Sequence, residues 1–243
     1  MNTTLKNGLT FLATAFALLG APALHAQLLT FDVDLNTAAL NSQNSANAPF
    51  YLDLQLNYGS TPQPSSTVTL SDFQFTGGNA LGSATTSGSA SGSLGSTVSL
   101  TASSSSQFNE LFQQFSSSTT DINFHALVSE SGAGTVPTEF ATAIFDNSLG
   151  SPAPLFTSAP DTQSLVLLNL NPTNTMANVG AFTSISSADG NTPVTGISAT
   201  ITPVPEPSTT AAILGGAVLL FAFCARRFRR LPLAGTPPSP TFD

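Results

Sequence analysis

The sequence predicts an all-β protein: a single jelly-roll-like β-sandwich with one short helix, framed by an N-terminal signal peptide and a C-terminal transmembrane helix. Eight or nine short stretches alternate apolar and polar residues, as strands with one buried face do. Gly, Pro and Asn separate these stretches, which fits the turns of a sandwich. Both ends of the chain carry long apolar runs. The strands are expected at 29–35, 50–57, 68–75, 98–102, 122–128, 140–145, 165–170, 181–185 and 194–201.

The first apolar run predicts a secretory signal peptide over residues 1–26. Lys6 supplies a positive charge, residues 8–19 are almost all apolar, and small residues follow. These are the three parts of a secretory signal. Cleavage after Ala23 fits the spacing of small residues better, whereas cleavage after Ala26 keeps the next strand-like segment whole. Both sites stay open, and we expect the second, which makes 27–202 the exported domain.

The second apolar run predicts a membrane span. Residues 209–225 form an apolar stretch of about 17 residues, close to the shortest helix that crosses a bilayer. A cluster of arginines follows, and cytoplasmic flanks of spans collect such residues. The exported domain then lies outside the inner membrane, as the signal peptide also predicts. The arginines that would stop transfer are Arg226, Arg227, Arg229 and Arg230, within a cytoplasmic segment 226–243.

A short motif stands directly before this span, in a linker at 203–208. It reads Val204, Pro205, Glu206, Pro207 and Ser208. The order of Pro-Glu-Pro triplet, short apolar helix and arginine cluster resembles the PEP-CTERM sorting signal. The resemblance implies recognition by exosortase, a membrane-embedded cysteine transpeptidase, and cleavage near the triplet. It also implies a Gram-negative host that makes extracellular polysaccharide. Members of that family usually end soon after the arginines, whereas this chain adds a Pro-rich tail at 231–243.

The exported domain carries a resemblance of its own. Segments 49–57, 68–73 and 108–115 look like one recurring family of PEP-CTERM exterior domains. The similarity covers most of residues 28–202. That family has no assigned activity, so the resemblance supports the architecture and implies no chemistry.

Composition restricts what the exported domain can bind. No Lys or Arg occurs between Lys6 and Arg226, while residues 27–203 hold eight Asp and three Glu, for a net charge of about −11. A domain without basic side chains cannot neutralise phosphates, which excludes nucleic acid as a partner. The only cysteine, Cys224, lies in the predicted span, so the domain has neither a disulfide nor a thiol nucleophile.

One segment predicts a helix instead of a strand. Phe108, Leu111, Phe112 and Phe115 recur at the spacing of an amphipathic helix. Ser106 would cap its start. We expect two helical turns that close one end of the sandwich, with the aromatic residues in the core.

Two irregularities are expected among the strands. Val68 and Leu70 have one parity and Phe73 and Phe75 the other, which predicts a bulge or tight bend at Ser71 and Asp72. Residues 77–95 consist mostly of Gly, Ser, Ala and Thr without alternation, and this composition predicts a long loop or a weak edge strand.

Acidic residues are the remaining candidates for chemistry. Asp32 and Asp34 lie about 7 Å apart on one strand face, given roughly 3.3 Å per residue. Together with Asp53 or Asp72 they could form an oxygen site for calcium. His125 is expected on the polar face of its strand as a surface residue. No zinc site or catalytic triad is indicated.

A polar and aromatic cluster is the candidate for glycan contact. It consists of Tyr51, Asp53, Asn57 and Tyr58. The expected function is therefore an exported, exosortase-sorted surface or matrix protein with a non-enzymatic structural or adhesive role in exopolysaccharide or biofilm. The alternatives are a carbohydrate-binding module and a hydrolase that uses a pair of carboxylates. Fold alone does not separate the three, because sandwiches support all of them.

Overall fold

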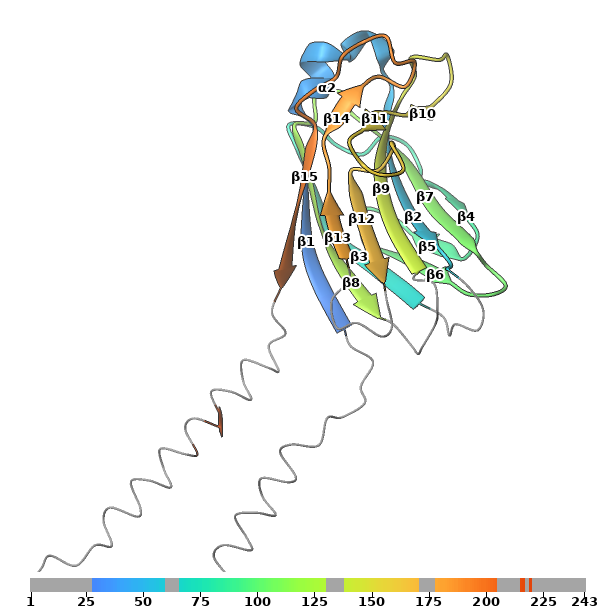
Figure 1. The fold of residues 1–243 in the computed structure, drawn as a ribbon, viewed down its shortest axis with the longest axis vertical. Helices are drawn as coiled ribbons and strands as arrows, with labels where there is room; N and C mark the ends of the chain where they lie inside the picture. Colours follow the sequence, from blue (N-terminus) through green and yellow to red (C-terminus); the bar gives the residue numbers. More distant parts are fainter. Residues whose placement is uncertain are drawn as a thin grey trace, which may run out of the picture.

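The computed structural model describes residues 28–59, 66–129, 138–170 and 178–204, together with Gly215, Gly216 and Leu219. The predicted signal peptide and arginine cluster lie outside these residues, as does nearly all of the predicted span. Within the described residues, no helix has the length and apolar character needed to cross a membrane. The described part of the chain is mostly strand, arranged as two antiparallel sheets packed face to face (Figure 1).

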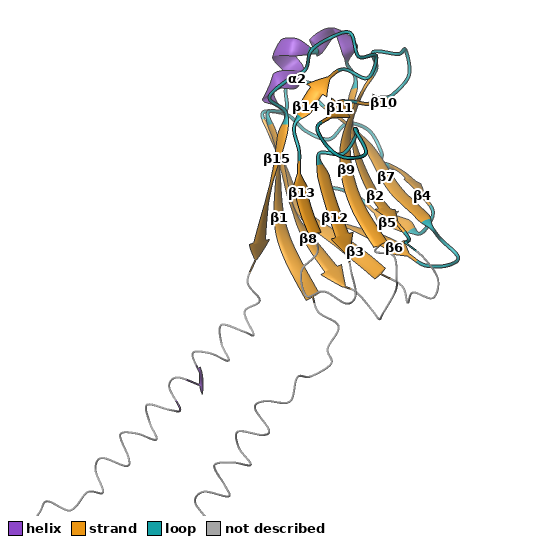
Figure 2. Cartoon of the chain, viewed as in Figure 1, coloured by secondary structure: helices purple, strands orange, loops and turns teal. Residues whose placement is uncertain are grey.

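The prediction of a β-sandwich is confirmed, and Figure 2 shows how strongly strands dominate the domain. The first sheet has the order β15 (Ser198–Val204), β1 (Leu28–Asn36), β8 (Asp121–Ser129), β3 (Ser66–Thr76), β6 (Thr97–Ala102) and β5 (Ala90–Gly92). The second has the order β13 (Asn178–Ala181), β12 (Val166–Leu170), β9 (Thr138–Asp146), β2 (Phe50–Asn57), β7 (Phe108–Phe115) and β4 (Thr85–Ser87), with β10 (Ala153–Pro154) beside β9. A separate small ribbon pairs β11 (Phe156–Thr157) with β14 (Ser184–Ser186).

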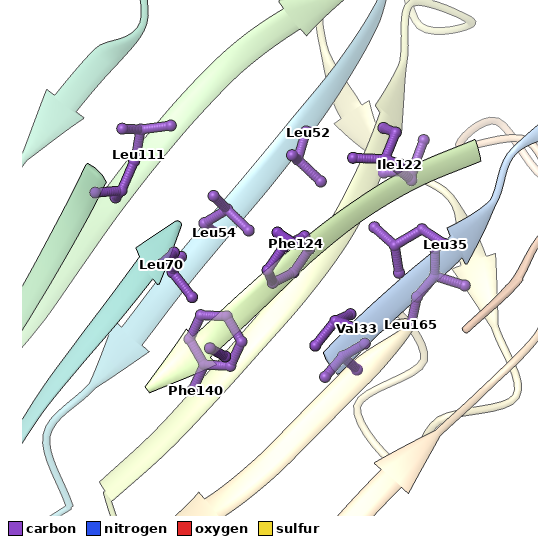
Figure 3. Close-up of a cluster of buried hydrophobic side chains, with 14 of the residues drawn as sticks. Val33, Leu35, Leu52, Leu54, Leu70, Leu111, Ile122, Phe124, Phe140 and Leu165 are labelled. Carbon is purple, nitrogen blue, oxygen red and sulfur yellow. The ribbon is translucent and has the colours of Figure 1, made fainter. Parts of the chain in front are cut away.

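The two sheets bury one continuous apolar core. Val33 of β1 and Phe124 of β8 come from the first sheet, and Leu54 of β2 and Phe140 of β9 come from the second (Figure 3). Each of these side chains is at most 2% exposed. Since the domain has no Lys or Arg, apolar burial, worth roughly 25 cal/mol per Å², and backbone pairing must stabilise it.

The first and last strands place both ends of the domain together. β1 and β15 are antiparallel neighbours, with Thr30 opposite Val204 and Asn36 opposite Ser198. The start of β1 and the end of β15 therefore lie at one end of the sandwich, and helix α2 (Ala38–Gln43) lies at the other (Figure 1).

The predicted helix at 108–115 is wrong, because these residues form strand β7. β7 pairs with β2 along its whole length and with β4. Leu111 and Phe115 point into the core, whereas Phe108 and Phe112 face outward. Because apolar residues occur on both faces of this strand, their positions coincide with the i, i+3, i+4 and i+7 spacing that is typical of a helix. Ser106 caps no helix, and its hydroxyl instead donates to the Oδ1 atom of Asn109 at 2.6 Å.

Within residues 28–204, as far as the structure describes them, the short α-helix occurs elsewhere. It is α2, directly after β1, and it is followed by the short 3-10 helix η1 (Ser45–Asn47). Leu40 of α2 is fully buried and caps the end of the core. The expectation of a helix that closes one end is thus met by residues 38–43.

The two predicted irregularities are confirmed. The register between β3 and β8 shifts between Ser71 and Gln74, and Asp72 takes a left-handed backbone conformation with φ of 57°. Two short strands, β4 and β5, fall in the Gly- and Ser-rich segment, and each lies at the edge of one sheet. Gly88 forms the turn between them with φ of +65°, where a Cβ atom would lie 2.1 Å from a backbone oxygen.

The expected strands near the C-terminal end of the domain differ in extent. The stretch 181–185 is divided between the end of β13 and β14. The stretch 194–201 becomes strand only from Ser198, and β15 then continues through Pro203 and Val204 into the predicted linker. Val194 and Ile197 lie before the strand but still bury their side chains in the core.

Candidate functional site

The outward face of β2 carries most of the predicted glycan cluster. Tyr51, Asp53 and Asn57 alternate with the buried leucines and so point away from the core, as Gln55 does between them. Tyr58 does not belong to this row, because its ring packs against the main core. The structure therefore brings three of the four predicted residues to one surface.

Neighbouring strands fix the surroundings of Asp53. Ala143 of β9 and Phe112 of β7 lie directly opposite it on either side. The ring of Phe112 stacks on Tyr51 at 4.8 Å between ring centroids and meets the ring of Phe145 edge-on at 5.1 Å. These rings form an apolar cluster on the same face, and Asp53 is fully buried.

Burial changes the chemistry of Asp53. Its Oδ2 atom accepts a hydrogen bond from the Nε2 atom of Gln55, and its carboxyl group also shares a hydrogen bond with the carboxyl group of Glu110. Removal from water disfavours the charged form, and the nearby carboxylate of Glu110 repels it. Together these effects raise the pKa of Asp53 to about 7. Near pH 7 the Asp53 carboxyl is therefore protonated in about half of the molecules.

A depression of about 60 Å³ opens beside Asp53, on the side of β2 that faces β9, over the small side chains of Ala141 and Ala143. Two further acids line it, Glu139 from β9 and Asp161 from the loop before β12. Burial raises the pKa of Glu139, and the charge of Asp161 raises it further. The other residues of its wall are Gln55, Asn57, Phe145, Pro154, Gln163 and Ser164.

Asp161 is held in a defined position by its own loop. The backbone N–H groups of Gln163 and Ser164 each donate to its Oδ1 atom at 3.0 Å, and the Ser164 hydroxyl donates to Oδ2. Burial raises the pKa of Asp161, but these hydrogen bonds outweigh burial and lower it overall. The carboxylate therefore stays charged at the mouth of the depression.

The outer face of the first sheet holds the other predicted acids. His125 lies on this face as expected, and its Nδ1 atom contacts the carboxylate of Asp32. Its Nε2 atom lies 3.9 Å from Asp72, so the imidazole occupies the space between the two aspartates. All three side chains are about half exposed or more. They line an open hollow of about 340 Å³ that also includes Asp34.

The calcium expectation stays a prediction. Asp32 and Asp34 share a face as expected, but Asp53 belongs to the opposite sheet and is not their neighbour. Over the ranges that the structure describes, no three His, Cys, Asp or Glu side chains form a group that could hold a metal ion.

The sorting residues are placed only in part. Val204 is the last residue of β15 and lies opposite Thr30. The remaining residues of the motif and the arginines, namely Pro205, Glu206, Pro207, Ser208, Arg226, Arg227, Arg229 and Arg230, lie outside the described residues.

Sequence reasoning missed Glu110, Glu139 and Asp161 as neighbours of Asp53. Glu110 was assigned to a helix, and a strand over 108–115 would have placed it on the same face as Phe112. Glu139 and Asp161 come from distant parts of the chain, and no local pattern indicates that they meet. Comparison with family models, curated proteins and solved structures finds no match to this chain.

Proposed function

We propose that the chain is an exported surface or extracellular-matrix protein, sorted by exosortase, with a non-enzymatic structural or adhesive role in exopolysaccharide or biofilm. Its β-sandwich is of the jelly-roll type, and the signal peptide and the C-terminal span deliver and hold it. The precursor is anchored in the inner membrane until the Pro-Glu-Pro motif is cut. Exosortase and extracellular polysaccharide are its partners.

The observation that carries this proposal is the pairing of β1 with β15. The domain begins and ends at the same end of the sandwich, and its last strand stops at Val204, the residue before Pro205. A single attachment there leaves the opposite end, with α2 and the ribbon of β11 and β14, facing away from the membrane. This arrangement suits a domain displayed on a surface and released by one cut.

The experiment that tests the proposal is mass spectrometry of the mature C-terminus, from protein purified from its native host. Trypsin cannot digest a domain without Lys or Arg, so the protease must cut at Asp or Glu. We expect a terminus between Val204 and Ser208 that depends on the host's exosortase. A chain that retains Arg226 and the tail in the mature protein would make this a plain membrane anchor and overturn the proposal.

A matched variant isolates the motif. Replacement of Glu206 by Ala should leave the full-length precursor in the membrane fraction. Replacement of Thr200, which lies in β15 outside the motif, by Ser should leave processing unchanged.

The second candidate is a carbohydrate-binding module. The outer face of the second sheet favours it, because the stacked rings of Tyr51 and Phe112 share this face with the amides of Gln55 and Asn57. Aromatic faces and amides are what sugar rings and hydroxyls contact in binding sites. Asp53 and Glu110 are also a close pair of carboxyl groups, and loss of an activity on single replacement of either would favour the hydrolase alternative.

A further inference from the structure

The end of β15 is the point where the folded domain meets the sorting motif. Val204 is the last residue of this strand and lies opposite Thr30 of β1. Pro203 lies opposite Phe31. Pro205, the next residue in the sequence, begins the Pro-Glu-Pro triplet. No residue of the sequence separates the triplet from the last backbone pair of the sheet.

The two ends of β15 are held differently. At its start, Ser198 forms an isolated bridge with Thr183. The N–H group of Ala199 donates to the carbonyl oxygen of Phe182 at 3.3 Å, so this end is held on the side away from β1 as well. From Thr200 onward β15 pairs with β1 alone, as far as the described residues go, because it forms the edge of its sheet (Figure 1). The end next to the triplet is therefore paired on one side.

Side-chain burial gives the same contrast between β15 and β1. In β15 no side chain is fully buried, and Thr202 and Pro203 are exposed. In β1, Phe31 and Val33 are at most 4% exposed, and β8 pairs with the other side of the strand. A segment with few buried contacts opens locally at a lower free-energy cost than the whole domain. The end of β15 can therefore separate from β1 while the core stays intact.

We propose that pairing with β1 regulates C-terminal processing: residues 202–204 must separate from β1 before exosortase cuts near the triplet. This inference rests on the proposed sorting function and adds a conformational step to it. An enzyme that cuts a peptide bond contacts the chain on both sides of that bond, and cleavage concentrates in exposed segments without paired backbone. On the N-terminal side of the triplet the chain is β15 itself, so the enzyme competes with β1 for it.

This step makes the rate of processing depend on the stability of one strand end. When opening and closing are fast relative to cleavage, the cleavage rate follows the equilibrium population of the open form. A change that lowers this population ten-fold lowers the rate by about the same factor. Pairing between β1 and β15 then determines how long the precursor stays anchored in the membrane.

A disulfide between the two strands tests this step. Asp32 and Thr202 lie directly opposite each other. Facing residues of antiparallel strands have Cα atoms about 4.5–5.5 Å apart, a distance that a disulfide spans. Asp32→Cys combined with Thr202→Cys should therefore hold the end of β15 on β1 once the domain reaches an oxidising compartment. All variants are made in a parent chain with Cys224→Ser, because Cys224 is the only native cysteine.

A second disulfide provides the matched control. Asn36 and Ser198 are opposite residues of the same two strands, roughly 13 Å further along at about 3.3 Å per residue. Asn36→Cys combined with Ser198→Cys cross-links the end of β15 that is already held on both sides. Protection from thiol labelling verifies both disulfides. Asp32→Cys alone accounts for loss of the contact between Asp32 and His125.

Processing is followed by pulse labelling of the full chain in its native host, as conversion of the precursor to the shorter mature form. We expect the disulfide between positions 32 and 202 to slow conversion by roughly ten-fold or more, because it removes the open form. The control disulfide should leave the rate within about two-fold of the parent. Insertion of Gly-Ser-Gly-Ser-Gly-Ser between Val204 and Pro205 should restore the rate of the slowed variant, because the enzyme then has unpaired chain beside the triplet.

Three results would overturn the inference. Conversion of the variant cross-linked at 32 and 202 at the parent's rate would mean that exosortase acts while β15 stays paired. Equal slowing by both disulfides would assign the effect to export or folding, and failure of the insertion to restore the rate would place the effect away from the end of β15. A parent chain that is never cut would refute the sorting proposal together with this step, whereas a parent that is cut and a disulfide without effect would refute this step alone.

Discussion

The outer faces of the two sheets hold the same kind of residue in opposite environments. On the first sheet, Asp32 and Asp72 remain about half exposed or more and flank His125. On the second, Asp53 is fully buried beside Glu110 and has no basic neighbour. Both faces belong to a domain without Lys or Arg, so the difference comes from burial and not from composition. A carboxylate that stays hydrated can remain charged at little cost in folding free energy. A buried carboxylate is stabilised only by a proton or by an external cation.

The two outer faces also differ in their apolar residues. On the second sheet the rings of Tyr51, Phe112 and Phe145 pack together, and Phe112 lies directly opposite Asp53. The first sheet has Asn123 and His125 at two of the outward positions of strand β8. With its amide oriented to donate, Asn123 lies 3.2 Å from a carboxylate oxygen of Asp34. Asp32 and Asp72 on the first face are thus solvated, whereas Asp53 on the second is desolvated.

The largest expected effect is on stability when Asp53 is replaced by Asn. The change removes a buried charge and lets an amide donate to Glu110. A pKa raised from 3.8 to about 7 corresponds to a cost of up to about 4 kcal/mol in the charged state. We expect Asp53→Asn to raise the free energy of unfolding at pH 8 by a few kcal/mol, measured by urea denaturation.

The matched replacement on the first face provides the control. Asp72→Asn removes one exposed carboxylate and should change the free energy of unfolding by less than about 0.5 kcal/mol. If both replacements stabilised the domain equally, general charge repulsion would explain the gain and the contrast between the faces would be lost.

The next effect is a dependence of stability on pH. The folded-state pKa of Asp53 lies above its unfolded value of 3.8, so the folded chain holds an extra proton between about pH 4 and pH 7. Protonation of Asp53 therefore contributes fully to the free energy of unfolding below pH 4. This contribution is lost as pH rises through 7, by up to about 1.4 kcal/mol per pH unit. Urea midpoints measured between pH 4 and pH 8 should fall and then level off.

Asp161 affects the pH dependence of stability in the opposite direction from Asp53 and in a lower pH range. Hydrogen bonds from its loop lower its pKa, so its contribution is present above its unfolded value of 3.8 and is lost as pH falls further. In Asp53→Asn the decline between pH 4 and pH 7 should largely vanish, while the loss at acid pH remains. A decline that persists in this variant would assign it to other groups.

The sequence predicted the strands well where one face is buried and the other is polar. The alternation in 29–35, 50–57 and 122–128 corresponds closely to β1, β2 and β8. The prediction from the sequence was wrong at β7. There Phe108 and Phe112 are apolar but face outward, and pairing with β2 outweighs the local periodicity that predicted a helix. Residues 38–43 form a helix that no clear periodic pattern indicated.

The candidate site was predictable only in part. Tyr51, Asp53 and Asn57 share a face because they lie on one strand, and alternation alone gives that result. The pairing of Asp53 with Glu110 depends on the register between β2 and β7, and the approach of Glu139 and Asp161 depends on β9 and on the loop before β12. The neighbours that Asp53 gains in this way lie more than 50 residues from it in sequence, and their approach leaves no local signal.

The smallest expected effect concerns the contact between His125 and Asp32 on the first face. Both side chains are about half exposed, so water already solvates them, and exposed ion pairs typically contribute about 0–1 kcal/mol. A double-mutant cycle with Asp32→Asn and His125→Gln should therefore give a coupling energy below about 1 kcal/mol near pH 6, and salt should reduce it further because exposed charges are screened. A coupling of several kcal/mol, insensitive to salt, would mean that this pair is as desolvated as Asp53 and Glu110. The contrast between the two faces would then have to be explained by the presence of a histidine rather than by burial.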